Sequence, residues 1–190
     1  MSDKVYLDAQ DLLDDAFRLG AAVVESGFRP SFILALWRGG APIGIAVQEY
    51  LAYHGIETDH IAIRTAHYAA AIDESADRVE IYGISYLLKN MTHEDRLLIV
   101  DDVFDTGRTV DAVIKHLQAK ARRNTPADVR IAVPYYKPTR NKTERVPDYA
   151  LHETTAWIKF PHSLEGLSHN EIRQHRPELA VILATAKTES

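Results

Sequence analysis

The segment LLIVDDVFDTGRT, residues 97–109, decides the fold class of this 190-residue chain. Its apolar residues predict a buried strand over 96–100. Two adjacent acids, Asp101 and Asp102, follow that strand, and a helix is predicted over 106–121. A strand that ends in polar residues and leads into a helix is typical of α/β sheets, in which ligands bind at the carboxyl ends of the strands.

The same alternation of strands and helices continues on either side of this segment. Apolar runs predict strands over 31–36, 60–65 and 129–135, and helical spacing predicts helices over 8–25 and 42–54. Pro42 stands in the first turn of the second of these helices and Gly55 just beyond its end, as helix boundaries favour. The alternation predicts an α/β fold with a doubly wound, mostly parallel sheet.

The remaining segments carry weaker patterns. Residues 66–80 are mostly small and acidic and predict a long loop or mobile flap. Residues 148–160 predict two short strands joined by a turn, and Ser168 and Glu171 have the spacing of a capping box that opens a last helical region. No repeat and no linker rich in Pro, Gly or Ser divides the chain, so we expect a single domain over 1–190.

Composition excludes several classes of function. Hydrophobic residues make up 46% and charged residues 26%, as in soluble globular proteins. The net charge of −5 and the pI near 6.0 disfavour nucleic-acid binding. There is no cysteine, no apolar run of about 18 residues and no secretory signal. We therefore expect a cytoplasmic protein that binds neither nucleic acid nor membrane.

The turn after the 96–100 strand has the parts of a sugar-phosphate site. Ionised carboxylates only accept hydrogen bonds, so Asp101 and Asp102 suit the vicinal hydroxyls of a sugar. Residues 106–109 offer hydroxyls and backbone N–H groups at a helix N-terminus, which suits a phosphate, and Gly107 permits close approach. The alternative for so short a turn is a simple helix cap at Asp105 or Thr106. Walker A and dinucleotide-binding motifs are absent, and a phosphoaspartyl enzyme leaves the hydroxyl-rich turn unexplained.

These thirteen residues closely resemble the phosphoribosyl-diphosphate signature of the type I phosphoribosyltransferases. The resemblance implies a Rossmann-like sheet with a small hood over the base and a mobile flap. It implies that Asp101 and Asp102 hold the ribose hydroxyls and, directly or through water, Mg²⁺. It further implies that Asp105, Thr106, Gly107, Arg108 and Thr109 wrap the 5-phosphate, and that Asp105 exchanges a proton with purine N7 as general acid/base.

A second motif, Trp37-Arg38-Gly39-Gly40, resembles the diphosphate loop of this family, in the Arg-Gly-Gly form of the xanthine-guanine enzymes. Glycines let backbone N–H groups approach the leaving diphosphate, and Arg38 adds a fixed charged fork. Alone, these residues would fit an ordinary tight turn with a surface arginine. With the first motif in the same chain, they predict donor binding by Arg38, Gly39 and Gly40.

A third stretch resembles the purine hood of 6-oxopurine phosphoribosyltransferases, here mainly over 137–170. The resemblance implies that Lys137 donates to O6 of the base, that Trp157 stacks on the ring, and that Ile158 contacts the base through its backbone. His162 and Ser163 follow Pro161 where the xanthine-guanine enzymes have Trp and then an acid, and Glu165 stands about two residues away from that acid's place. The choice among hypoxanthine, guanine and xanthine therefore stays open.

The resemblance thus predicts a Mg²⁺-dependent transferase of purine salvage that moves 5-phosphoribosyl from phosphoribosyl diphosphate to N9 of a 6-oxopurine. Its partners would be these small molecules and further copies of the chain, in a dimer or tetramer. One alternative is a regulatory protein that binds phosphoribosyl diphosphate without turnover. Another is a phosphoribosyltransferase for orotate, uracil or adenine. The sequence leaves the kinetic order and the number of subunits open.

Overall fold

The computed structural model describes residues 4–68 and 78–185. The chain divides into two compact units: Gln10–Thr155, and a smaller unit that joins Met1–Ala9 to Ala156–Ser190. The hood predicted over 137–170 is therefore divided between the two units. A single domain over the whole chain stays a prediction.

Seven strands of the larger unit form one sheet in the order β4-β3-β2-β5-β7-β6, with β8 also paired to β7. The strands are β2 Phe32–Trp37, β3 Asp59–Tyr68, β4 Arg78–Tyr82, β5 Arg96–Val100, β6 Val103–Phe104, β7 Asp128–Tyr136 and β8 Tyr149–Glu153. Every pair is parallel except β3 with β4. The predicted α/β fold with a mostly parallel sheet is confirmed.

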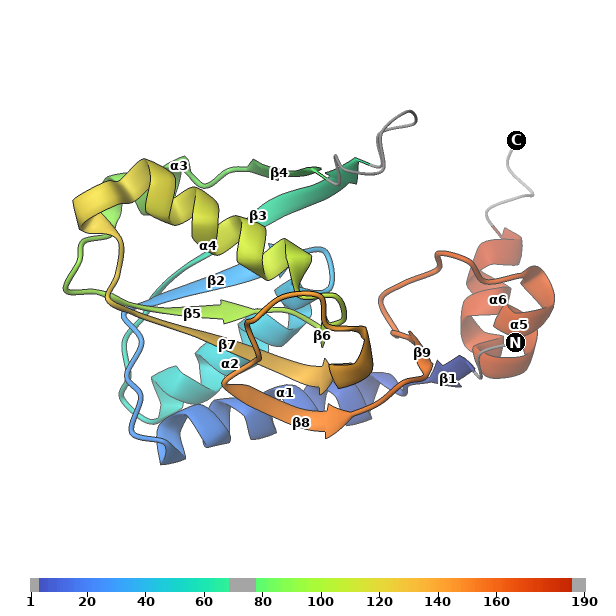
Figure 1. The fold of residues 1–190 in the computed structure, drawn as a ribbon. Helices are drawn as coiled ribbons and strands as arrows, with labels where there is room; N and C mark the ends of the chain where they lie inside the picture. Colours follow the sequence, from blue (N-terminus) through green and yellow to red (C-terminus); the bar gives the residue numbers. More distant parts are fainter. Residues whose placement is uncertain (1–3, 69–77, 186–190) are drawn as a thin grey trace. The chain divides into compact units, whose positions relative to one another are not determined.

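Helices cover both faces of this sheet (Figure 1). On one face lie α1 (Ala9–Glu25) and α2 (Gly40–Tyr53), and on the other lie α3 (Ser85–Asn90) and α4 (Arg108–Ala121). Leu34 and Leu36 of β2 belong to the buried cluster that contains the apolar side of α4, whereas Ala35 between them meets α2 at Gly44. Both faces of the sheet are buried at β2 and β5, which explains why these two strands are near-continuous apolar runs.

The structure corrects the loop predicted over 66–80. β3 continues to Tyr68, and β4 pairs with it antiparallel from Arg78 onward, so the predicted loop is strand at both ends. Residues 69–77 lie outside the described residues, and the role of the flap stays a prediction. The six residues of α3 were also not predicted as a helix, because so short a segment has little periodicity; its Leu87 is fully buried against the core.

The smaller unit contains a two-stranded parallel pair and two helices. β1 (Lys4–Tyr6) pairs with β9 (Trp157–Lys159), and α5 (His169–His175) precedes α6 (Pro177–Thr185). The capping box is confirmed, since the Ser168 hydroxyl accepts from the Glu171 N–H and the Glu171 carboxylate accepts from the Ser168 N–H. The two short strands predicted within 148–160 are observed as β8 and β9, joined by the short connection 154–156; β8 belongs to the large sheet, whereas β9 pairs with β1.

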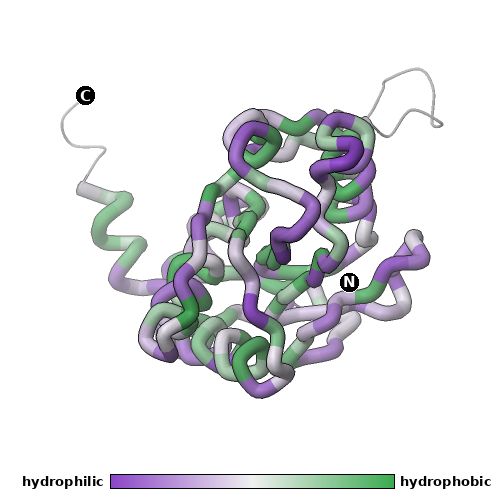
Figure 2. The backbone as a smooth tube through the Cα atoms, turned by 90° about the vertical axis from the view of Figure 1, so that its left-hand side faces the viewer, coloured by the Kyte–Doolittle hydropathy of each residue, from purple (hydrophilic) through white to green (hydrophobic). Residues whose placement is uncertain are grey.

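Apolar residues are not confined to the cores. α6 is apolar over most of its length (Figure 2), and its Val181 and Ile182 are exposed. Among the described residues no helix has the length and apolar character that crossing a bilayer requires.

Candidate active site

The two sequence motifs meet at the carboxyl edge of β2 and β5. A Cβ added to Gly39 would lie 1.9 Å from Oδ2 of Asp102, and one added to Gly40 would lie 2.4 Å from the carbonyl oxygen of Val100. The peptide between Trp37 and Arg38, at the start of this loop, is cis. Only glycine fits at positions 39 and 40 without displacement of the acids or the strand. The structure therefore brings the predicted diphosphate loop against the predicted ribose-binding acids.

Asp101 and Asp102 interrupt the sheet between β5 and β6. The Asp101 N–H donates to the carbonyl of Ala132 (3.2 Å), and the Asp102 N–H donates to Oδ1 of Asp101 (3.0 Å). Burial, and then the charge of Asp102, raise the pKa of the Asp101 carboxyl well above its usual range. The pair is thus suited to partners that donate hydrogen bonds or bring positive charge.

The same two carboxylates fit the demands of Mg²⁺. This ion binds through one or two protein carboxylates and takes its other ligands from substrate phosphates and water. The described part of the chain holds no cluster of three or more His, Cys, Asp or Glu side chains placed for a metal. A pair of acids such as this one is compatible with an ion that takes its remaining ligands from a phosphate-bearing ligand and from water.

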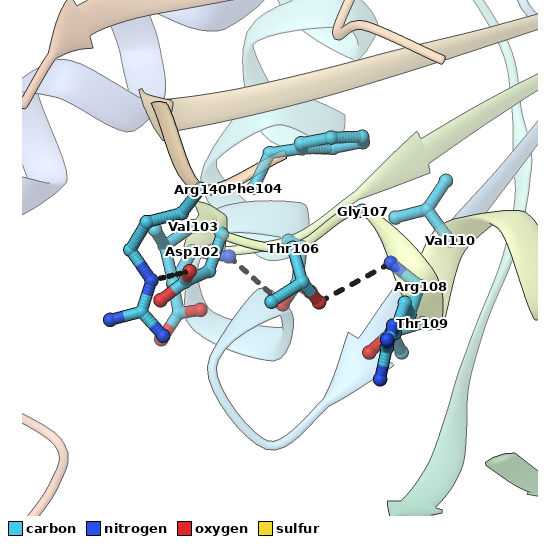
Figure 3. A pocket seen from close by; sticks show the side chains of 11 residues that line it. Asp102, Val103, Phe104, Thr106, Gly107, Arg108, Thr109, Val110 and Arg140 are labelled. Atoms are coloured by element: carbon cyan, nitrogen blue, oxygen red, sulfur yellow. Dashed lines mark hydrogen bonds and ion pairs between the residues drawn. The ribbon is translucent and has the colours of Figure 1, made fainter. Parts of the chain in front are cut away.

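A cavity of about 410 Å³ lies over the turn that follows these acids. It is lined by residues 101–110 and by Arg140. Figure 3 shows Arg140 at one end of the cavity and Arg108 at the other, with Thr106 between them. The cavity opens onto the N-terminus of α4, where the positive end of the helix dipole favours an anion.

Gly107, the residue before α4, fixes the shape of this turn. Its φ of +74° lies in the left-handed region, and a Cβ there would lie 2.5 Å from Oγ1 of Thr143 and 2.8 Å from the ring of Phe104. The Thr106 hydroxyl faces the N–H of Arg108 at 3.5 Å. Conformation and space both require glycine here, so the turn is as specific as the sequence motif indicated.

The predicted base-binding lysine lies beside the predicted acid/base. Lys137 follows β7, is 4% exposed, and places its Nζ 3.2 Å from Oδ2 of Asp105. Its own N–H donates to the carbonyl of Phe104 (2.9 Å), which ties the residue to the strand before Asp105. Two side chains 32 residues apart in the chain thus form one polar pair.

Sequence reasoning missed Arg140 as a residue of this site. It ends the short 3-10 helix Pro138–Arg140, and its Nε lies 2.7 Å from Oδ1 of Asp105. The available signal was a second cation, three residues after Lys137, in a loop that follows a parallel strand.

Trp157 and Ile158 belong to the smaller unit, so their contact with a base stays a prediction. Trp157 is 47% exposed, and the buried Lys159 places its Nζ 5.4 Å from the indole centroid while donating to the carbonyl of Glu165 (2.9 Å). His162 stacks on Phe160, with ring centroids 5.4 Å apart.

One guanidinium organises the loop after β9. Arg176 donates to the carbonyls of Phe160 (2.7 Å) and Ser163 (2.9 Å), and more weakly to those of Lys159 and Pro161. Arg176 thus binds the loop after β9 at several carbonyls, in addition to the bond from Lys159 to Glu165.

Comparisons with known proteins agree with these features. The sequence profile of the phosphoribosyl transferase domain matches residues 3–169. The purine phosphoribosyltransferase of Pyrococcus horikoshii Ot3 is 26% identical, with a TM-score of 0.66 over 87% of this chain and 97% of that one. The xanthine-guanine-hypoxanthine phosphoribosyltransferase of Helicobacter pylori is 20% identical, with a TM-score of 0.62 over 83% and 92%.

A hypothetical protein from Neisseria gonorrhoeae, solved with bound ppGpp, is 19% identical with a TM-score of 0.73 over 96% of this chain and 98% of that one. No curated protein sequence matches the chain. Because the domain profile extends over most of its length and the fold agrees, this chain belongs to the phosphoribosyltransferase family.

Proposed function

We propose that this protein transfers the 5-phosphoribosyl group of phosphoribosyl diphosphate to N9 of a 6-oxopurine, with the aid of Mg²⁺. The observation that carries this proposal is the 3.2 Å contact between Nζ of Lys137 and Oδ2 of Asp105, at the edge of a cavity over the family's phosphate-binding turn. It supports a site that recognises two neighbouring polar atoms of a base.

The chemistry of the two side chains favours a 6-oxopurine. Guanine presents O6 and N7 side by side on one edge, and adenine presents an amino group in place of O6. The Lys137 ammonium only donates, so it favours the carbonyl over the amino group. Asp105, beside it, would then face N7. This supports hypoxanthine, guanine or xanthine over adenine.

The donor would occupy the rest of the site. Asp101 and Asp102 would accept from the ribose hydroxyls, and the turn at Thr106–Thr109 would receive the 5-phosphate on its N–H groups and hydroxyls. Arg38, Gly39 and Gly40 would contact the diphosphate. The close packing of Gly39 against Asp102 and of Gly40 against Val100 and Asp101 supports this placement of the donor.

In the reaction, N9 of the base attacks the anomeric carbon while the bond from that carbon to the diphosphate breaks. Positive charge develops on the ribose, as in glycoside hydrolysis. Attack from the opposite face gives the β-nucleotide, and the proton on N7 passes to the Asp105 carboxylate. Mg²⁺, held by Asp101 and Asp102 directly or through water, would neutralise charge on the leaving diphosphate.

A panel of bases tests the proposal. The protein is incubated with phosphoribosyl diphosphate, Mg²⁺ and, in separate reactions, hypoxanthine, guanine, xanthine, adenine, orotate or uracil. We expect nucleotide from one or more 6-oxopurines and little from the other three bases. A preference for adenine or a pyrimidine, or no nucleotide at all, would contradict it.

Lys137→Met provides the matched test of recognition. A hydrogen bond to a charged group contributes about 1.5–3 kcal/mol, so kcat/KM for the 6-oxopurine should fall about 10- to 100-fold. Lys142→Met is the control, because Lys142 is an exposed lysine of the same loop, whereas Lys137 is buried beside Asp105. Equal losses in both variants would show that the lysine at position 137 does not read the base.

A regulatory protein without turnover is the second candidate. The structural neighbour from Neisseria gonorrhoeae was solved with ppGpp, and it matches nearly the whole of this chain in length. A regulator of this kind would bind the donor or ppGpp in a calorimeter yet form no nucleotide with any base. We also propose that the protein is a dimer or tetramer, which analytical ultracentrifugation measures directly.

A further inference from the structure

Asp105 contacts two cations, one at each carboxylate oxygen. Oδ2 lies 3.2 Å from Nζ of Lys137, and Oδ1 lies 2.7 Å from Nε of Arg140. The lysine side chain is 5% exposed and the arginine side chain is 47% exposed. The buried cation donates a hydrogen bond to one oxygen, whereas the outer cation forms an ion pair with the other oxygen by proximity, without the angle of a hydrogen bond.

Backbone hydrogen bonds hold the loop that carries Arg140 against the turn that carries Asp105. The Lys137 N–H donates to the carbonyl of Phe104 (2.9 Å), and the Lys142 N–H donates to that of Thr106 (3.0 Å). The loop is thus tied to both chain neighbours of Asp105. Within it, the Arg140 N–H donates to the carbonyl of Lys137 (3.0 Å), so the guanidinium starts from a defined position.

The proposed reaction needs this arrangement. When a base binds, Lys137 must direct a donor at O6, and its hold on Asp105 weakens. An otherwise unsupported carboxylate could then rotate away from N7 or turn both oxygens towards Lys137. A guanidinium is planar and always charged, so it can fix the rotation of a carboxylate through one oxygen. The other oxygen remains directed at the base.

We propose that Arg140 is the positioning residue of this site: it holds Oδ1 of Asp105 so that Oδ2 stays beside Lys137 and faces N7. Arg140 acts through Asp105 and need not touch the base. The inference rests on the proposed function, because it assigns the proton exchange to Asp105. A small displacement of a reacting group can cost about 100-fold in rate, so the loss of this contact should lower kcat rather than donor affinity.

The first test compares Arg140→Ala, Arg140→Lys and the wild type in turnover with a 6-oxopurine. We expect Arg140→Ala to lower kcat about 10- to 100-fold while KM for phosphoribosyl diphosphate changes less than about threefold. Added guanidinium should restore part of the kcat of Arg140→Ala, and Arg140→Lys should retain an intermediate kcat. Arg145→Ala is the control. Arg145 stands in the same loop as Arg140, but it forms its ion pair with Asp111 of α4 and does not line the cavity.

A crystal structure of Arg140→Ala gives a readout that does not depend on turnover. We expect the Asp105 carboxylate to rotate towards Lys137. An unrotated carboxylate overturns the proposal, and so does a kcat loss that guanidinium leaves unchanged and that follows the loss in Tm. Wild-type protein that makes no nucleotide would instead reject the proposed function, and the orientation of Asp105 would still decide whether Arg140 positions it.

Discussion

Replacing Gly39 by alanine should damage donor binding far more than it damages the fold. Gly39 has φ −65° and ψ −32°, a conformation that alanine adopts readily, so no backbone strain is expected. The new Cβ, however, would lie 1.9 Å from Oδ2 and 2.2 Å from Cγ of Asp102. Since non-bonded atoms of this size settle at about 3.5 Å, the carboxylate must move by about 1.5 Å.

The expected loss of activity depends on how far the Asp102 carboxylate is displaced. The Asp102 carboxylate ends a rotatable side chain, so rotation relieves the clash at a cost in stability of about 1 kcal/mol or less. A displacement of about 1 Å in a positioning group can lower a rate about 100-fold. We therefore expect Gly39→Ala to reduce kcat/KM for phosphoribosyl diphosphate about 100-fold, with a change in Tm of only a few degrees.

Two other glycines show whether the effect is specific. At Gly40 the new Cβ would meet backbone, 2.4 Å from the carbonyl oxygen of Val100, so Gly40→Ala should cost about 1–3 kcal/mol of stability as well as activity. At Gly44, one turn into α2, it would lie 2.9 Å from Cβ of Ala35, so Gly44→Ala should lower Tm without a selective loss of donor affinity.

Initial rates with the donor varied at saturating base, together with calorimetric melting of each variant, separate these cases. A donor kcat/KM of Gly39→Ala within about threefold of the wild type would show that the position of the Asp102 carboxylate does not govern donor use.

Three further predictions concern other parts of the molecule. Burial, and then the charge of Asp102, raise the pKa of Asp101, so the folded state binds this proton more tightly than the unfolded state. The stability of the fold that depends on protonated Asp101 is therefore present at acid pH and is lost as pH rises through the raised pKa. Asp101→Asn should therefore raise Tm more at about pH 8 than at about pH 4, and equal shifts in thermal scans at both pH values would exclude this. Asp105→Asn should lower kcat about 10²- to 10⁴-fold with donor KM nearly unchanged, and steady-state kinetics in which KM carries the loss would count against an acid/base role. Arg176→Met should lower the free energy of unfolding by about 2 kcal/mol, since Arg176 donates charged hydrogen bonds to several carbonyls; urea titration with no loss would mean that these bonds do not stabilise the loop.

Elements that are determined by short stretches of sequence were predicted correctly. β5 was predicted at 96–100 and observed there, because an apolar run that ends in two acids has few alternatives. The helix predicted over 8–25 is observed as α1, Ala9–Glu25. The turn at Gly107 was also predicted from the glycine itself, and the structure shows why glycine stands there: its φ is left-handed and its neighbours leave no room for a Cβ.

Pairings between distant parts of the chain could not be predicted in the same way. The sequence predicted a strand in the region of β9 but no partner for it, and its partner is β1, more than 150 residues earlier in the chain. The partnership of Arg140 with Asp105 depends on the loop after β7 folding back over the turn after β5. Lys137 was placed at this site by family resemblance, whereas Arg140 had no such guide and became visible only through its distance to Asp105.

The central claim is that the turn from Asp101 to Thr109 binds a phosphorylated ribose. A crystal structure of the protein soaked with ribose 5-phosphate tests it most directly. We predict the phosphate on the backbone N–H groups at the start of α4 and the ring hydroxyls at Asp101 and Asp102. A sugar phosphate bound elsewhere, with this turn vacant at a saturating ligand concentration, would contradict the account.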